Sequence, residues 1–329
     1  MKMNSSLLFS IDDLLELYIK KFENVTFKSE NTIANKPIYY FISNEGKRIR
    51  PLLLLAACNM FEGSIDIAVN PAFGIQMFHN FTLVHDDIID NSDVRRGRPA
   101  VHKKYSVNNA IISGDLMMIY AYDYLSKVEE TQLREVITSF NDTAGKIIEG
   151  QQMDIDFETR MDVDEKEYIK MIGYKTSVLL AESLRIGGVV ANTSDVNKEL
   201  IYNFGLNLGL SFQIKDDWLD TFGTGEKFGK KIGGDILQNK KTMLFVKAWK
   251  LANTRTKEEI KALMNHEDKN EKIERMMNIY NELGVDDLIE SQMTEYFQKG
   301  LRYLEKIAIE EERKLPLLNF AHKIYNRDF

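Results

Sequence analysis

The sequence predicts an all-α protein, and two observations carry this prediction. Residues 100–315 contain no proline, although the whole chain has five. The same stretch is rich in apolar residues at helical spacing, as in Ile112, Leu116 and Ile119, whereas alternating strand patterns are scarce. We therefore expect up to about a dozen helices joined by short loops.

The expected helices can be followed from the N-terminus. Residues 1–21 have the pattern of an amphipathic helix, and Pro51 favours the first turn of another, because an apolar run follows it directly. Two later helices are expected to carry acidic motifs at residues 86–90 and 216–220. Residues 254–313 are heavily charged, which is typical of the solvated faces of surface helices.

The composition indicates a single domain that spans residues 1–329. Hydrophobic residues make up 44% of the chain, and no linker or break in composition marks a domain boundary. No apolar run reaches the roughly 18 residues of a transmembrane helix, and the N-terminus lacks a signal-peptide pattern, so we do not expect an integral membrane protein. The net charge of −7 argues against general nucleic-acid binding.

The chain has one cysteine, Cys58, which excludes an intrachain disulfide framework and a cysteine-based metal site. Its apolar neighbours indicate a small buried residue rather than a nucleophile. A reduced, cytoplasmic setting agrees best with this cysteine usage.

The most informative feature is an acidic pentapeptide that occurs twice, as Asp86-Asp87-Ile88-Ile89-Asp90 and as Asp216-Asp217-Trp218-Leu219-Asp220. On a helix, carboxylates four residues apart lie on one face, where like charges repel unless a cation lies between them. A single copy is about as often a solvated helix face, but apolar residues precede both copies and indicate partial burial. Oxygen ligands favour Mg²⁺, which also binds substrate phosphates.

Three basic segments could bind an anion. The first is Gly46–Pro51, at the start of a helix, the second is Asp93–Pro99, directly after the first acidic motif, and the third joins Gly229–Lys231 to Asn239–Lys241 after the second motif. Each alone could be an ordinary basic loop. Because each acidic helix runs into a basic loop, the sequence predicts the binding of a diphosphate bridged by metal ions.

The sequence resembles the trans-type isoprenyl diphosphate synthases over essentially its whole length. Besides the two acidic motifs and the lysine-bearing loop, the resemblance rests on Gly46-Lys47-Arg48-Ile49-Arg50-Pro51, His79, Arg95-Arg96-Gly97, Gly150-Gln151-Gln152-Met153-Asp154, Lys175-Thr176 and Phe212-Gln213. It implies an all-α, isoprenoid synthase-type bundle of about ten or more helices around a deep central cavity, usually as a homodimer.

The resemblance also implies a role for each matching residue. The implied ligands of Mg²⁺, with about three ions when substrate is bound and with Mn²⁺ able to substitute, are Asp86, Asp87, Asp90, Asp216, Asp217 and Asp220. The implied partners of the allylic diphosphate are Arg95, Lys175, Lys240 and either Lys230 or Lys231, of which Lys231 directly precedes Ile232-Gly233 and is favoured. The implied isopentenyl diphosphate pocket consists of Lys47, Arg50, His79 and Arg96, and residues expected around the site are Gly46, Gln151 and Asp154.

The implied reaction begins with loss of diphosphate from the allylic substrate. The resemblance assigns the catalytic roles to Arg95, Lys175, Thr176 and Gln213, with the dipoles around Lys175-Thr176 and the Gln213 side chain stabilising the carbocation. The C=C bond of isopentenyl diphosphate then attacks, and a proton is lost. His79 by itself would more often be a core histidine, but it lies two helical turns before Asp86 and therefore on the same face.

The resemblance implies that residues upstream of the first acidic motif set the length of the product. Spacing alone places Thr82 near the face of Asp86, with Phe78 turned aside and Phe81 further round. The resemblance implies that Phe81 lines the channel and stops the growing chain near geranylgeranyl diphosphate. Farnesyl diphosphate is the second expectation, and a longer, octaprenyl-like product is the third.

Two alternatives come from other classes of protein. A class I terpene cyclase also ionises an allylic diphosphate, but it has no use for an isopentenyl diphosphate pocket such as Lys47, Arg50 and Arg96. An inert subunit of a heteromeric prenyl synthase would be expected to have eroded acidic motifs, whereas both motifs are intact in this sequence.

Overall fold

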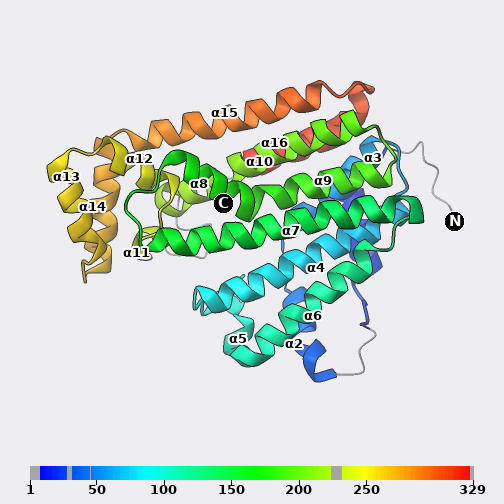
Figure 1. Cartoon of the computed structure of the whole chain (residues 1–329), viewed down its shortest axis with the longest axis horizontal. Coiled ribbons are helices and arrows are strands. Elements are labelled where there is room, and N and C mark those ends of the chain that lie inside the picture. Colours follow the sequence, from blue (N-terminus) through cyan, green and yellow to red (C-terminus); the bar gives the residue numbers. More distant parts are fainter. Residues whose placement is uncertain (1–7, 28–31, 45, 224–231, 327–329) are drawn as a thin grey trace. The chain divides into compact units, whose positions relative to one another are not determined.

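The computed structural model describes residues 8–27, 32–44, 46–223 and 232–326. This part of the chain is almost entirely helical (Figure 1), so the all-α prediction is confirmed. In chain order the elements are α1 (Ile11–Phe22), α2 (Thr32–Ile42), α3 (Ile49–Met60), α4 (Ile65–Ile89), β1 (Val94–Arg95), β2 (Arg98–Pro99), α5 (Val101–Lys104), α6 (Val107–Leu125), α7 (Glu130–Glu158), α8 (Glu165–Ile172), the π-helical turn η1 (Gly173–Ser177), α9 (Val178–Val190), α10 (Asp195–Phe222), α11 (Gly234–Leu237), α12 (Met243–Leu251), α13 (Thr254–Met264), α14 (Lys269–Glu282), α15 (Val285–Glu305) and α16 (Glu311–Tyr325).

The chain divides into two compact units. The first unit comprises Met1–Asn141, Glu182–Ile201 and Ala308–Asn319, and the second comprises Asp142–Ala181, Tyr202–Ile307 and Phe320–Phe329. Helices α7, α9, α10 and α16 contribute residues to both units. The single domain and the central cavity expected from the sequence therefore stay predictions.

The first unit is built around α3 and α4. Every residue of α3 from Pro51 to Met60 is buried, and a helix that is apolar all round is expected at the centre of a core. Cys58 lies in this stretch, as the sequence predicted, and burial raises the pKa of its thiol to about 12. The predicted N-terminal helix is α1, which begins after the capping residue Ser10 and buries Leu14 and Tyr18; residues 1–7 lie outside the described part.

Helices α4 and α6 lie side by side in the first unit (Figure 1). A Cβ atom at Gly74 of α4 would be 2.8 Å from the carbonyl oxygen of Ala121, and one at Gly114 of α6 would overlap the ring of His85. As α4 advances from residue 74 to residue 85, its partners on α6 run backwards, so the two helices are antiparallel. A missing side chain on each helix permits this close packing.

The second unit has its own core, in which α8, α10, α12, α14 and α15 bury apolar side chains. Its largest fully buried side chain is Tyr168 of α8. The charged helices α13, α14 and α15 bury one face each, as their sequence pattern predicted. Among the described residues, no helix is both long enough and apolar enough to cross a lipid bilayer.

Candidate active site

The first acidic motif lies at the C-terminal end of α4. The helix ends in a Schellman motif, in which Asn91 has a φ of 49° and the amide of Ser92 donates to the carbonyl of Asp87 at 2.9 Å. Because the helix ends here, the three carboxylates differ in their exposure to solvent. Asp87 is buried, Asp86 is half-buried, and Asp90 is exposed at the C-cap.

The buried carboxylate of Asp87 binds Arg95. The Nε and Nη2 atoms of Arg95 both donate to Oδ1 of Asp87, at 2.9 and 2.5 Å. The side chain of Asp87 is only 1% exposed, so its charge needs a counter-charge in contact. The sequence placed Asp87 among the metal ligands and Arg95 among the diphosphate ligands, and the structure shows that these two side chains bind each other.

Arg95 belongs to a short β-hairpin that the sequence analysis described only as a basic loop. Residues Val94–Arg95 pair with Arg98–Pro99, and the two residues between them, Arg96 and Gly97, have φ angles of 51° and 75°. Positive φ at both central residues defines a type I′ turn, for which glycine is favoured. The turn presents Arg95 and Arg96 from one rigid support.

The C-terminal end of α2 anchors this hairpin. Asn44 donates from Nδ2 to the carbonyl of Arg95 at 3.2 Å and accepts from Nη1 of Arg96 with its own carbonyl at 3.4 Å. The hydroxyl of Tyr40 donates to the carbonyl of Pro99 at 2.8 Å. These contacts hold the hairpin against the C-terminal end of α2.

Three predicted residues of the isopentenyl diphosphate pocket lie together in the first unit. Nη1 of Arg50 donates to Nε2 of His79 at 2.9 Å, so this ring nitrogen carries no proton. Burial, followed by the positive charges of Arg50, Arg96 and Arg95, lowers the pKa of His79 well below its usual range. A Cβ atom at Gly46 would be 2.8 Å from the guanidinium carbon of Arg96, so glycine leaves room for that side chain.

Lys47, the remaining member of this predicted pocket, is exposed just before the N-terminus of α3. The residue that caps this helix, Arg48, has a left-handed φ of 46°. Lys47 and Arg50 thus lie at a helix N-terminus, as the sequence predicted, where the helix dipole favours an anion.

The second acidic motif lies within the last turns of α10, in the second unit. Asp216 and Asp220 are half-buried, and Asp217 is buried. Asp220 fixes the start of α11, because its carboxylate accepts from the amide of Asp235 at 2.8 Å and its carbonyl accepts from the amide of Gly233 at 2.7 Å. Lys240 lies beside Asp235, with 3.7 Å between Nζ and Oδ1. Lys230 and Lys231 lie outside the described residues.

Neutral donors surround the buried carboxylate of Asp217. It accepts hydrogen bonds from the hydroxyl of Tyr168, from Nε2 of Gln213 at 3.1 Å and from the amide of Met243 at 3.4 Å. Burial, and then the negative charge of Asp235, raises the pKa of Asp217 to about 7 despite these donors. The carboxylate of Asp217 therefore fixes the orientation of the Gln213 and Tyr168 side chains.

The predicted catalytic pair Lys175-Thr176 lies in η1, a turn of π-helix, which often marks a functional site. Two glycines let neighbouring helices approach its backbone. A Cβ atom at Gly150 of α7 would be 2.9 Å from Cα of Lys175, and one at Gly209 of α10 would be 2.6 Å from Cα of Ser177.

The side chains of this turn contact the other predicted catalytic residues. Nζ of Lys175 lies 2.5 Å from Oδ2 of Asp154, and the hydroxyl of Thr176 donates to Oε1 of Gln213 at 3.0 Å. Gln151, one turn before Asp154, is half-buried, and its Oε1 has no hydrogen-bond partner among the described residues. The second unit thus brings together Lys175, Thr176, Gln213 and Asp154.

The predicted chain-length residues belong to a series of aromatic rings on α4. The Phe78 ring, which is fully buried, lies 4.9 Å from that of Phe140 and 5.6 Å from that of Phe81. The ring of Phe81 is in turn 4.7 Å from that of His85. Thr82 is half-buried and donates to the carbonyl of His79 at 2.9 Å.

Among the described residues, no group of three or more histidine, cysteine, aspartate or glutamate side chains could hold a metal ion by itself. The donor set nevertheless suits Mg²⁺, which is usually bound through one or two carboxylates together with substrate phosphates. Asp87 in the first unit and Asp217 in the second already accept hydrogen bonds from protein side chains, Asp87 from Arg95 and Asp217 from Tyr168 and Gln213.

Comparison with known proteins identifies the kind of protein that carries these features. The profile of the polyprenyl synthetase family matches residues 31–283. The chain belongs to the polyprenyl synthetase family. It is 34% identical to geranylgeranyl diphosphate synthase of Saccharolobus solfataricus, over 92% of this chain and 100% of that protein. It is 33% identical to the enzyme of the same name from Methanosarcina mazei, over 88% of each chain.

Solved structures of this family have the same fold. A crystal structure of a geranylgeranyl pyrophosphate synthase matches with a TM-score of 0.91 and 37% identity, over 97% of this chain and 99% of that one. The synthase from Corynebacterium glutamicum, solved with isoprenyl diphosphate and magnesium, matches with a TM-score of 0.84 and 25% identity, over 96% and 97% of the two chains.

Several residues that contact the predicted site residues were not found from the sequence. They are Asn44, which contacts Arg95 and Arg96, Tyr168, which binds Asp217, Gly209, which admits the π-helical turn, and His85, which contacts Phe81. Only His85 had a local signal, because it lies four residues after Phe81 and therefore on the same helix face.

The lowered pKa of His79 predicts a pH-dependent stability. Below about pH 6.5 the unfolded chain binds a proton at this residue that the folded protein does not. As the pH is lowered further, this group should therefore reduce the free energy of unfolding by up to about 1.4 kcal/mol for each pH unit. His79→Asn should remove this contribution. Urea unfolding of both proteins at several pH values measures it. His266→Asn, at a histidine of the second unit, is the control, and equal pH slopes for wild type and His79→Asn would contradict the prediction.

Proposed function

We propose that this chain is a Mg²⁺-dependent prenyltransferase that condenses isopentenyl diphosphate head to tail with an allylic diphosphate. The main product proposed is all-trans geranylgeranyl diphosphate, with a C20 chain. Family membership and the relatives named geranylgeranyl diphosphate synthase support this proposal. A cytoplasmic location is part of the same proposal.

The observation that carries the proposal is the polar group around η1. Asp217 accepts from the amide nitrogen of Gln213, so the amide oxygen of Gln213 is the atom directed at the hydroxyl of Thr176. Oxygen dipoles that are fixed before the reaction can stabilise a cation without reorganising. This group therefore suits the positive charge that develops on an allylic carbon when the diphosphate leaves.

Basic side chains of both units are proposed to bind the diphosphates. Lys175, Arg95 and a lysine among Lys230, Lys231 and Lys240 would contact the allylic diphosphate, and Lys47, Arg50, His79 and Arg96 would contact isopentenyl diphosphate. Arg50 and Arg96 offer paired donors that match phosphate oxygens, and His79 could gain a proton when a diphosphate offsets the nearby arginine charges.

Asp86, Asp90 and Asp216 are proposed to hold about three Mg²⁺ ions once a diphosphate is bound, with Mn²⁺ as a possible substitute. When bound, these ions would stabilise the charge on the departing diphosphate. The chain's own lysines and arginines would orient that diphosphate.

The activity assay that tests this proposal uses the purified chain with Mg²⁺, isopentenyl diphosphate and, separately, dimethylallyl, geranyl or farnesyl diphosphate. We expect a C20 alcohol as the main dephosphorylated product. Asp86→Ala and Asp216→Ala should each lower kcat by at least about 100-fold, because each removes a proposed ligand of the Mg²⁺ ions that would stabilise the charge on the leaving diphosphate. Asp66→Ala, at the other end of α4, is the matched control.

Other outcomes of this assay separate the alternatives. Cyclic hydrocarbon formed without isopentenyl diphosphate would indicate a terpene cyclase. No turnover with any primer would support the inert-subunit hypothesis instead.

Phe81 is proposed to stop the growing chain, and Phe81→Ala should lengthen it. Relatives named geranylfarnesyl diphosphate synthase, such as the one from Natronomonas pharaonis at 30% identity over 84% of this chain, show that longer products occur among similar sequences. We expect Phe81→Ala to make the product with at least one further isoprene unit a major species. Sizing of the products measures this, and an unchanged product spectrum would refute the role of Phe81.

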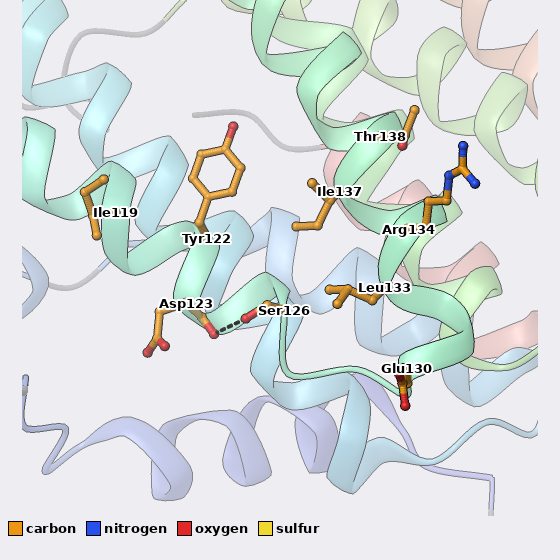
Figure 2. A pocket seen from close by; sticks show the side chains of 9 residues that line it. All are labelled: Ile119, Tyr122, Asp123, Ser126, Glu130, Leu133, Arg134, Ile137 and Thr138. Carbon is orange, nitrogen blue, oxygen red and sulfur yellow. Dashed lines mark hydrogen bonds between the residues drawn. The ribbon is translucent and has the colours of Figure 1, made fainter.

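A homodimer is also proposed, and α6 supports it. Four of its large apolar side chains, Val107, Ile111, Ile112 and Ile119, are 40–62% exposed on one face of the helix. The same face continues into a groove of about 750 Å³ between α6 and α7, where Figure 2 shows Tyr122, Leu133 and Ile137. An apolar surface of this kind on a water-facing helix is typical of a protein interface.

Sedimentation or light scattering tests the homodimer. Wild type should have twice the mass of one chain, and the double variant Ile112→Glu with Ile119→Glu should have the mass of one chain, because buried unpaired carboxylates are costly. Val196→Glu, at a side chain that is 68% exposed on α10, is the matched control. A monomeric wild type, or dissociation by the control, would refute this assignment.

A further inference from the structure

The position of His85 is set by α6 rather than by its own helix. Its Nε2 atom lies 3.3 Å from the carbonyl oxygen of Ile111 and 3.8 Å from a carboxylate oxygen of Asp115. Since the carbonyl can only accept, Nε2 is the nitrogen that donates in this contact. Both partners are on α6, so the ring of His85 spans from α4 to α6.

Gly114 provides the space for this ring. A Cβ atom built on Gly114 would overlap Nε2 of His85 and would lie 2.6 Å from its Cδ2. Any other residue at this position would therefore force the imidazole away from α6. The backbone of residue 114 is helical and buried, so it has little room to move instead.

The displaced ring would meet Phe81. The rings of Phe81 and His85 are 4.7 Å apart in an edge-to-face arrangement, one helical turn from each other. On its other side Phe81 packs on Phe78, which is fully buried against Phe140 and cannot yield easily. The orientation of Phe81 therefore depends on where His85 lies.

We propose that His85, seated on Gly114, is a positioning residue that fixes Phe81 and thereby sets the length of the product. This inference rests on the proposed function and on the role of Phe81 within it. It assigns product length to a contact between two helices. With the His85 ring in place, Phe81 is held between two rings; without it, Phe81 gains freedom to rotate and let a longer chain pass.

The test compares products of the purified full-length chain with Mg²⁺, isopentenyl diphosphate and farnesyl or geranyl diphosphate. His85→Ala should raise the ratio of longer product to C20 product by about threefold or more, because Phe81 loses its neighbour. Gly114→Ala should have the opposite effect and raise the ratio of shorter product to C20 product, because the imidazole is pushed against Phe81. His85→Phe keeps a ring at this position and should restore the wild-type ratio.

A matched control and a double variant make the test specific. Gly145→Ala places the same methyl group on an exposed position of α7 with nothing within 4 Å, and it should leave the product ratio unchanged. In a Phe81→Ala background, His85→Ala and Gly114→Ala should have no further effect, because the residue through which they act is missing.

The outcomes are distinguishable. Since the measured quantity is a ratio of products, a variant with slow turnover still gives a value. If His85→Ala is inactive, Gly114→Ala still provides a test, because it lies outside the acidic motif. An active Gly114→Ala variant with the wild-type ratio, or shifts that persist without Phe81, would overturn this inference alone. Absence of any prenyl transfer by the wild type would overturn the proposed function and this inference together.

Discussion

The site depends on the burial of the middle carboxylate in each acidic motif. A carboxylate taken out of water must be paired or hydrogen-bonded, or it destabilises the fold. Asp87 meets this requirement through Arg95, and Asp217 through Tyr168 and Gln213. The burial of these two carboxylates thereby fixes the orientation of Arg95 in one unit and of Gln213 in the other, which are proposed to contact a diphosphate and a carbocation.

Two motifs with the same spacing therefore differ in their electrostatics. Asp87 is bound by a full positive charge, whereas Asp217 is surrounded by neutral donors and by the negative charge of Asp235, so its pKa rises to about 7. The difference follows from what lies opposite each helix, which the pentapeptides do not encode. Two motifs with the same spacing of aspartates therefore need not have the same surroundings, and their last carboxylates differ as well, because Asp90 is exposed and Asp220 is half-buried.

The sequence predicted what depends on local pattern. Helical periodicity and missing prolines were sufficient for the all-α fold, whereas the assignment of Asp86, Asp90 and Asp216 to metal binding stays a prediction. The sequence did not reveal Tyr168 or Asn44, whose partners are 49 and 51 residues away. It also missed the π-helical turn at Lys175, because that turn depends on close approach by Gly150 and Gly209 from other helices. Such contacts are tertiary and leave no periodic trace.

The same distinction applies to specificity. A bulky residue before an acidic motif blocks a channel only in the orientation that its neighbours allow, and an aromatic side chain has few rotamers but large reach. For Phe81 that orientation is bounded by Phe78, by His85 and, through His85, by a glycine on α6. Two chains with phenylalanine at this position and different residues at position 114 would present different channels. Under the role proposed for Phe81, product length would depend on how two helices pack, and the residue that contacts the growing chain would carry only part of the information.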